Sequence, residues 1–368
     1  MEFNFMGVGA AGNKAVRDLI DMGITDVDHC VLVNSTDKDF PDNYTGNKKI
    51  LCEDNVGCGK ERTIAKEYAI RAIESGMFDD LFARDVIVVT SVEGGTGSGA
   101  APILAEYVKE VVGKNVHIFC FLGFEDDTRG LQNTVEFFQE ISAFDPDVIT
   151  ICNKSFLVDA NNNRFKAEQL ANKELAKKVK VLMGTSLQKS EQNIDETDIF
   201  KVVNTSGYKI IESVEFGSPL TDVQQFNKLC KQLCISGKSL RPVSSGIARL
   251  GVVLNIAPET EASIDTEFRE FKEYFGTPHE IFIHKQYDGK KEYIQVIASG
   301  LKLPFQDVEN IFSKYEEESA KVDKSEDDFN SRVSSFMIKP EDRKFDMVRK
   351  GNKTVEKSSF LRAFETRL

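Results

Sequence analysis

The chain has 368 residues, with 47 lysines and arginines against 59 aspartates and glutamates, and a formal net charge of −12. This length allows two domains with their own cores, and the acidic balance argues against a surface that coats nucleic acid. No apolar run approaches the roughly 18 residues of a membrane span, so we expect no direct membrane insertion. Seven scattered cysteines and an N-terminus without a secretory pattern favour a reduced, cytoplasmic protein.

The first predicted strand, residues 3–7, runs into a glycine-rich turn and a helix that ends near Met22. The candidate binding residues of this turn are Gly7, Gly9, Ala10, Ala11, Gly12 and Asn13. Their G-x-G-x-x-G spacing is typical of a dinucleotide-binding βαβ unit. A second predicted strand, 30–33, is followed by polar residues that include Asn34 and Asp37, at the edge where open α/β sheets bind ligands. Asp37 would hold a ribose in a nicotinamide-dependent enzyme, and an ordinary polar turn is the alternative.

The longest glycine-rich stretch, residues 94–102, follows the apolar strand 86–89 and precedes an amphipathic helix. Its candidate binding residues are Gly94, Gly95, Thr96, Gly97, Ser98 and Gly99. Glycine lets several N–H groups converge on one anion, and the helix dipole points the same way, so this stretch predicts a phosphate cradle. A tight turn that needs glycine for packing would explain one or two glycines, not four. Another glycine loop, with Gly57 and Gly59, precedes a helix predicted over 62–75.

Two further predicted strands, 116–122 and 148–151, bring polar residues to the same edge of the sheet. Glu125 and Arg129 stand four apart at the start of the helix after the first strand, so both can face one ligand; a solvated ion pair is the alternative. Asn153 follows the second strand. Strands alternate with helices over roughly 155 residues, which predicts a doubly wound parallel sheet with glycine loops at strand carboxyl ends.

A long helix is predicted from about Lys166 to Leu187, and Asn172 near its start could reach the ligand. The polar loop that follows contains Asn193, Asp195 and Asp198, and by itself it predicts a helix cap at Asp198. Residues 207–300 predict a second, smaller α/β unit without phosphate loops, which we expect to serve as support or interface. Its strands are predicted near 208–214, 247–255, 279–285 and 292–299, and its helices near 219–233 and 260–274.

The sequence therefore predicts a ligand-binding domain followed by a linking helix, a second domain and a tail. The boundaries are 1–165 for the first domain, 166–188 for the central helix, 189–300 for the loop and second domain, 301–318 for a C-terminal helix and 319–368 for linker and tail. The linker is acidic, whereas the last thirty residues carry nine basic and five acidic side chains, a net charge of +4. A basic tail on an acidic body predicts a segment that docks a partner.

Taken in order, these motifs resemble the tubulin/FtsZ superfamily of filament-forming GTPases. Residues 94–99 are similar to its signature phosphate loop, and 7–13, 34–37 and 57–60 are similar to its first three loops. The resemblance implies that Glu125 and Arg129 contact a ribose and that Asn153 and Asn172 contact a guanine. It also implies that Asn193, Asp195 and Asp198 enter the nucleotide site of the next subunit. The third loop is most like TubZ-type plasmid and phage proteins, whereas residues 359–362 resemble part of the FtsZ tail peptide.

The resemblance implies a GTPase that binds GTP and GDP and assembles with itself head to tail. Mg²⁺ is expected because the loops at 7–13 and 94–99 contain no lysine, and Asp37 would hold one of its waters. Asp195 and Asp198 would position the attacking water, with Asn193 assisting. The expected role is plasmid or phage DNA segregation through a DNA-binding adaptor on the tail. A division-ring scaffold is the alternative, and a dinucleotide-dependent oxidoreductase is a distant one, supported by residues 7–12 alone.

Overall fold

The computed structural model describes residues 1–184, 196–217, 219–242, 246–287, 289 and 291–322. The predicted catalytic residues Asn193 and Asp195 and the tail at 339–368 lie outside the described residues. The strands are β1 Asn4–Val8, β2 Cys30–Asn34, β3 Asn47–Ile50, β4 Val86–Ser91, β5 Val116–Leu122, β6 Asp147–Cys152, β7 Gly207–Glu215, β8 Arg249–Asn255, β9 Glu280–Gln286 and β10 Tyr293–Leu301.

The helices alternate with the strands in the first half of the chain and follow a mixed order in the second. They are α1 Gly9–Asp21, α2 Arg62–Glu74, α3 Gly95–Tyr107, α4 Thr128–Ile141, α5 Arg164–Met183, α6 Glu196–Val203, α7 Val223–Cys234, α8 Arg269–Phe275 and α9 Phe305–Val322. Short 3₁₀ segments cover Val27–His29, Asp37–Asp39, Asn153–Phe156 and Pro258–Ser263, and a π-helical turn covers Val108–Val112. No helix in the described part of the chain is long and apolar enough to cross a bilayer.

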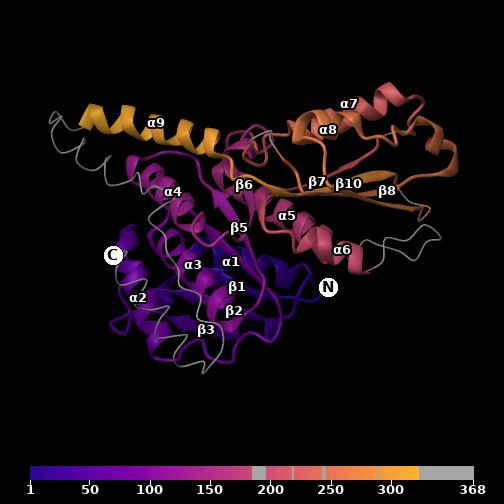
Figure 1. The fold of residues 1–368 in the computed structure, drawn as a ribbon. Coiled ribbons are helices and arrows are strands. Elements are labelled where there is room, and N and C mark those ends of the chain that lie inside the picture. Colours follow the sequence, from indigo (N-terminus) through magenta and orange to yellow (C-terminus); the bar gives the residue numbers. More distant parts are fainter. Residues whose placement is uncertain (185–195, 218, 243–245, 288, 290, 323–368) are drawn as a thin grey trace.

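The described strands form one ten-stranded sheet in the order β3-β2-β1-β4-β5-β6-β7-β10-β8-β9. The first seven strands in this order run parallel, which confirms the predicted doubly wound sheet, and β10 is antiparallel to both β7 and β8. The second half therefore extends the same sheet (Figure 1). The join between the halves is short, because β6 and β7 pair only through Asp147 with Gly207 and Val148 with Tyr208.

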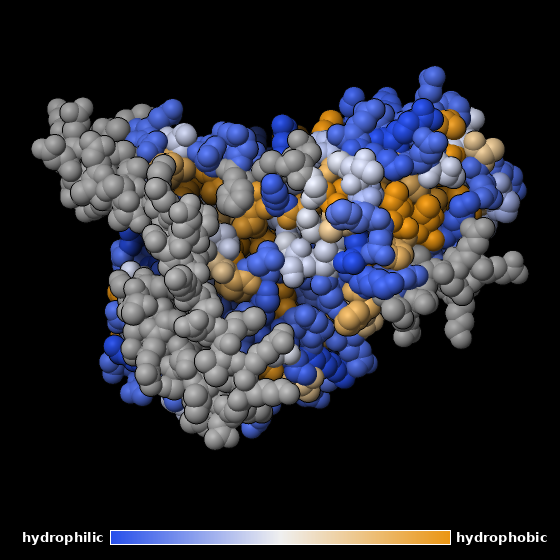
Figure 2. Space-filling view, in the orientation of Figure 1, coloured by the Kyte–Doolittle hydropathy of each residue, from blue (hydrophilic) through white to orange (hydrophobic). Residues whose placement is uncertain are grey.

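Two hydrophobic layers enclose the parallel strands. Phe5 on β1 packs in the layer that contains residues of α1 and α5, whereas its neighbour Met6 packs in the layer that contains residues of α2, α3 and α4. Because the strands are covered on both faces, their sequences are continuous apolar runs, as is usual for parallel sheets. In the space-filling view, hydrophobic side chains also reach the surface near β8 and β10 (Figure 2).

Helix α5 runs along the sheet from the carboxyl ends of the strands to their amino ends. At its start, Arg164 pairs with Asp126, which follows β5 at the carboxyl edge. At its end, the Met183 carbonyl accepts a 2.9 Å hydrogen bond from the N-terminal amine of Met1, just before β1. The 20 residues of α5 span about 30 Å, so its end lies at the edge opposite to the strand carboxyl ends. Helix α6 ends at Val203, near the same edge, because β7 begins four residues later at Gly207, which pairs with Asp147 at the start of β6.

Two predicted helix boundaries are wrong, each for a local reason. The long helix ends at Met183 and not near Leu187, because Gly184 takes a left-handed conformation with φ 67° and stops it. The helix predicted over 260–274 is reduced to α8 after a 3₁₀ turn, because the Asp265 side chain accepts hydrogen bonds from the backbone N–H groups of Glu267 and Arg269.

A buried cluster of ionisable side chains fastens the short join between β6 and β7. Lys209 Nζ and His117 Nδ1 lie 2.6 Å and 2.8 Å from Asp147 Oδ2, and all three side chains are buried. Burial alone would raise the pKa of Asp147, but Lys209 and His117 outweigh it and hold that pKa below its usual value. Burial also lowers the pKa of Lys209, although Asp147 opposes that change. The charges at this join therefore depend on one another.

We expect Asp147→Ala to lower the free energy of unfolding by about 3–5 kcal/mol, because Lys209 would remain buried without its counter-charge. The measurement is chemical denaturation followed by circular dichroism. A matched control is Glu215→Ala, which removes an exposed partner of Lys291 and should cost about 1 kcal/mol or less. Equal losses in the two variants would contradict the role given to the cluster.

Candidate functional site

Two helices begin directly at the carboxyl ends of neighbouring strands. Helix α1 starts at Gly9, one residue after β1, and α3 starts at Gly95, four residues after β4. The glycines at 95–99 were expected in a loop, but they form the first turn of α3. Neither helix has a side-chain cap or an acidic residue in its first turn, so their free N–H groups and positive dipole ends remain available to an anion.

Several of these glycines are required by packing. A Cβ at Gly12 would lie 2.1 Å from the Val89 carbonyl oxygen, and a Cβ at Gly9 would lie 2.9 Å from the Gly97 nitrogen. In contrast, a Cβ at Gly57, Gly59 or Gly94 would meet no atom within 4 Å. Packing therefore explains part of the glycine pattern, and the remaining glycines face open space.

That open space is a cavity of about 320 Å³ at the carboxyl edge of the sheet. Its lining brings together the four loops that the sequence singled out, at 7–13, 34–37, 57–60 and 94–99. The lining residues are Val8, Gly9, Ala10, Ala11, Asn34, Ser35, Asp39, Gly57, Cys58, Gly59, Lys60, Ser91, Gly94, Gly95, Thr96 and Gly97. The volume lies in the range of small-molecule and cofactor sites.

Asn34 lines this cavity and has an unused hydrogen-bond donor in its side chain. Its side chain is buried, and its Oδ1 accepts a 2.8 Å hydrogen bond from the Ser35 N–H, which fixes the orientation of the amide. Its Nδ2 has no hydrogen-bond partner. A buried donor without a partner costs free energy, so a ligand acceptor in the cavity would relieve that cost. The Ser35 and Thr96 hydroxyls, 3.0 Å apart, join the loop at 34–37 to the glycine-rich residues 94–99 (the central loop).

Four predicted binding or metal residues instead contact other parts of the protein. Asn13 holds both the N–H and the carbonyl of Val33 on β2, at 3.2 Å and 3.1 Å. The Ser98 hydroxyl donates to the Gly94 carbonyl. Asn172 Nδ2 donates to Asp18 at 2.6 Å, and Asp37 accepts from the side chain of Asn55, also at 2.6 Å. None of the four lines the cavity, and their predicted ligand contacts stay predictions.

Glu125 and Arg129 lie in separate ion pairs. Glu125, at φ 59°, accepts from Lys154 at 3.0 Å and from Lys314 on α9 at 2.5 Å. Burial raises the pKa of the Glu125 carboxyl, but these two lysines outweigh it and hold the pKa below its usual value. Arg129 contacts Glu61, in the loop before α2. The structure therefore joins the loop after β5 to α9, which also packs on α4.

Asn153 lies directly after β6, and its Oδ1 is buried without a hydrogen-bond partner. Asp198 is the third residue of α6 and not its cap, so the capping interpretation is wrong. Its carboxylate lies 3.4 Å from Lys201 Nζ. Asp198 does not line the cavity, and its helix leads into β7 at the amino edge of the sheet.

Asp39, Asn133 and Glu93 lie in or beside the cavity but are not among the site residues predicted from sequence. Asp39 lines it, two positions after the predicted Asp37. Asn133 on α4 is buried and donates from Nδ2 to the carbonyls of Lys60 and Glu93, at 3.1 Å and 3.0 Å, which fastens two loops together. Burial raises the pKa of Glu93, beside the central loop. Only Asp39 carried a sequence signal, because it continues the polar stretch after β2.

Arg62 is a buried side chain that bonds to the backbone of the central loop. Its side chain is 2% exposed and contacts Glu136 and Glu140 on α4 at 2.9 Å and 2.6 Å. It also donates at 2.9 Å to the carbonyl of Ser98. Pro102, four residues later in α3, has no N–H to bond that carbonyl. The proline therefore leaves an acceptor that the buried guanidinium occupies.

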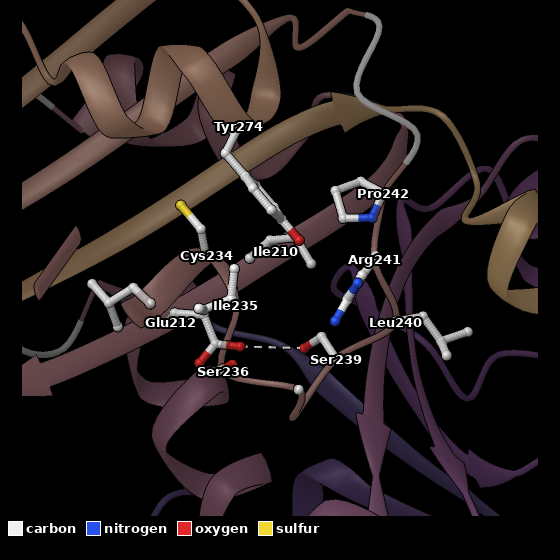
Figure 3. Close-up of a pocket in the computed structure, with 12 residues that line it drawn as sticks. Ile210, Glu212, Cys234, Ile235, Ser236, Ser239, Leu240, Arg241, Pro242 and Tyr274 are labelled. Atoms are coloured by element: carbon white, nitrogen blue, oxygen red, sulfur yellow. Dashed lines mark hydrogen bonds between the residues drawn. The ribbon is translucent and has the colours of Figure 1, made fainter. Parts of the chain in front are cut away.

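A second hollow, between β7, α7 and α8, is much smaller. Its lining includes Glu212, Ser239 and Tyr274, and Ser239 donates to Glu212 at 3.3 Å (Figure 3). Its volume of about 10 Å³ leaves room for roughly one water molecule. It is therefore too small for an organic ligand.

Parallel strands with glycine-rich turns, two uncapped helix starts and one cavity at their carboxyl ends form the arrangement with which many α/β proteins bind nucleotides. Residues 2–161 match the Tubulin/FtsZ family, GTPase domain. The match covers less than half of the chain, namely the part that forms β1 to β6 and the cavity, and it agrees with the resemblance that the sequence motifs indicated.

Three relatives illustrate the range of the similarity. The cell division protein FtsZ of Mycoplasmopsis pulmonis is 27% identical over 212 residues, which are 56% of this chain and 53% of that protein. The chain thus spans about half the length of the curated relatives it matches. TubZ of the Clostridium botulinum phage c-st is 22% identical, with a TM-score of 0.67 over 87% of this chain and 98% of that chain. CetZ2 of Haloferax volcanii, solved as a GTPγS-bound protofilament, is 19% identical, with a TM-score of 0.68 over 88% and 99%. TubZ and CetZ match about equally well, so the predicted TubZ type is not singled out.

Gly12→Ala and Gly94→Ala should separate packing from ligand binding. At Gly12 the added methyl overlaps the Val89 carbonyl, and we expect a loss of about 1–3 kcal/mol in the free energy of unfolding. Gly94 has φ −80°, which alanine accepts, and open space, so Gly94→Ala should leave stability within about 0.5 kcal/mol. Denaturation curves and nucleotide titration of both variants check this. Unfolding of Gly94→Ala would contradict the assignment.

Proposed function

We propose that this chain is a cytoplasmic GTPase that binds GTP and GDP in the 320 Å³ cavity and assembles head to tail into filaments. The observation that carries the proposal is the convergence of two uncapped helix starts and the unpartnered Asn34 amide on that cavity. Backbone N–H groups at helix starts bind phosphates, and an amide donor serves a sugar or phosphate oxygen. The family match supports guanine as the base.

Mg²⁺ fits the proposal with one carboxylate from the cavity. Asp39, Ser35 and Thr96 line it, and no cluster of three or more His, Cys, Asp or Glu side chains that could hold a metal occurs within the described ranges. Mg²⁺ commonly keeps several waters and uses one or two carboxylates with substrate phosphates, and it would neutralise phosphate charge here. Asp39 would hold the ion. Asp37, the residue expected from the sequence, is two positions earlier in the chain and accepts a hydrogen bond from Asn55.

Head-to-tail assembly is supported by the positions of the cavity and of Asp198. The cavity lies at the carboxyl edge of the sheet, whereas α6 leads into β7 at the opposite edge, where Gly207 pairs with Asp147 at the start of β6. One subunit therefore cannot bring Asp198 to its own cavity, but stacked subunits can bring it to a neighbour's. Such a heterologous contact builds open filaments. Asp198, together with Asn193 and Asp195, would position the attacking water, a contribution of about 10²–10⁴ in rate.

We expect GTP, and not ATP, to drive assembly into filaments that sediment. We expect Asp198→Ala to form filaments that hydrolyse GTP at least about 100-fold more slowly than the unmodified protein. The mutation removes a carboxylate from the neighbour's cavity and leaves the subunit's own cavity intact, so GTP binding should be unchanged. Pelleting, phosphate release and nucleotide titration measure the three quantities. Equal pelleting with ATP would contradict the proposed specificity for guanine. GTP hydrolysis at the unmodified rate in Asp198→Ala would contradict the proposed catalytic role of Asp198.

The cellular use that we propose is plasmid or phage DNA segregation, supported by the third glycine loop and by the TubZ fold match. The alternative, a division-ring scaffold, is supported by the FtsZ relatives and by residues 359–362. The two uses require different neighbouring genes. A small DNA-binding adaptor gene beside this one would favour segregation, whereas a cluster of division genes would overturn it.

The basic tail at 339–368 is the proposed contact for a DNA-binding adaptor or another partner. A chain that ends at Ile338 should still pellet with GTP but should no longer retain its adaptor, and the interaction of the full chain should weaken with salt because the tail carries a net charge of +4. Co-sedimentation at two salt concentrations measures this. Loss of pelleting in the shortened but folded chain would assign the tail to the filament contact instead.

A further inference from the structure

The cavity has a single cationic side chain. Among its described lining residues, Lys60 carries the only positive charge and Asp39 the only negative one. A nucleoside triphosphate would bring several negative charges into this space. The position of Lys60 therefore decides how much of that charge the protein itself can balance.

The backbone at Lys60 is held firmly against the central loop. Lys60 has φ 67°, unusual for a residue with a side chain, and its carbonyl accepts from buried Asn133. A Cβ at Gly95 would lie 2.7 Å from the Lys60 Cα, so the lysine stands directly beside the first turn of α3. This arrangement places a flexible ammonium group next to the N–H groups that face the cavity.

The ammonium itself is held only loosely. Lys60 Nζ lies 2.7 Å from Asp127 Oδ2, and the two side chains are 51% and 44% exposed. Ion pairs as exposed as this one contribute little to stability, so the lysine can leave Asp127 at small cost. Asp127 keeps its other contact, because its Oδ1 accepts a 2.8 Å hydrogen bond from the Gly130 N–H at the start of α4. The N-cap of α4 therefore does not depend on Lys60.

Lys60 also stands at the rim of the cavity, whereas Gly9 and Gly97 at its floor are buried. Phosphates that lie on the floor contact the helix starts first, and the outermost phosphate comes within reach of the rim. We propose that Lys60 exchanges Asp127 for the terminal phosphate of a bound nucleoside triphosphate, and so discriminates triphosphate from diphosphate. This inference rests on the proposed nucleotide site and adds a specificity-determining residue to it.

The test compares the dissociation constants of GTPγS, GDP and guanosine by calorimetric titration, below the concentration at which the protein pellets. Lys60→Gln keeps a polar side chain that is one atom shorter and removes its charge, so it should weaken GTPγS about tenfold and GDP less than about threefold. Guanosine should bind unchanged. Lys60→Gly, which suits the left-handed backbone, should reproduce this pattern if Lys60→Gln folds poorly.

Asp127→Asn provides a change in the opposite direction. Asparagine is also a good N-cap, and it no longer competes for the ammonium, so GTPγS should bind about two- to threefold more tightly. Lys291→Gln, in an exposed ion pair with Glu215, controls for the loss of one positive charge and should change neither affinity.

Equal weakening of GTPγS and GDP by Lys60→Gln, or no tightening in Asp127→Asn, would overturn the proposal while leaving the nucleotide site in place. Failure of the unmodified protein to bind either nucleotide would overturn the proposed function, and this inference with it.

Discussion

Gly9 and Gly97 lie against each other where α1 and α3 leave the sheet, and a single Cβ on Gly9 would come within 2.9 Å of the Gly97 nitrogen. Because neither residue has a side chain, the starts of two helices share one small space. Their uncapped N–H groups and dipoles then add on the same side of the sheet. The cavity, its unused Asn34 donor and the surrounding loops all depend on this close approach.

The surrounding contacts hold that arrangement without filling it. Asn13 fixes the first turn of α1 to β2, Arg62 supports the first turn of α3 through the Ser98 carbonyl, and Asn133 fastens the loops of Lys60 and Glu93. Each of these polar side chains is buried and bonds to backbone groups, so each sets the position of a chain segment. A site that depends on preorganised N–H groups needs such support, because its donors cannot reorient as side chains do.

Much of this architecture could be predicted from sequence, because buried parallel strands leave continuous apolar runs and glycine loops mark their carboxyl ends. The alternation of strands and helices and the gathering of four loops around one cavity followed from those rules. Short-range patterns could not decide what each polar residue contacts. Asn13 and Asn172 looked free to reach a ligand, but their partners, Val33 and Asp18, come from other elements. Asp37 and Asp39 are both acidic and two residues apart, and only the 3₁₀ turn and Asn55 decide which one faces the cavity.

The cluster at the join of the two halves has a consequence for how this sequence can vary among relatives. Asp147, Lys209 and His117 come from three adjacent strands, far apart in the chain, and share one buried space. A change at one position leaves a buried charge at another without its partner. Tolerated changes should therefore occur as sets, in which the three residues are either all ionisable or all apolar. In an alignment these three columns should therefore covary, and together they would mark the seam between the halves.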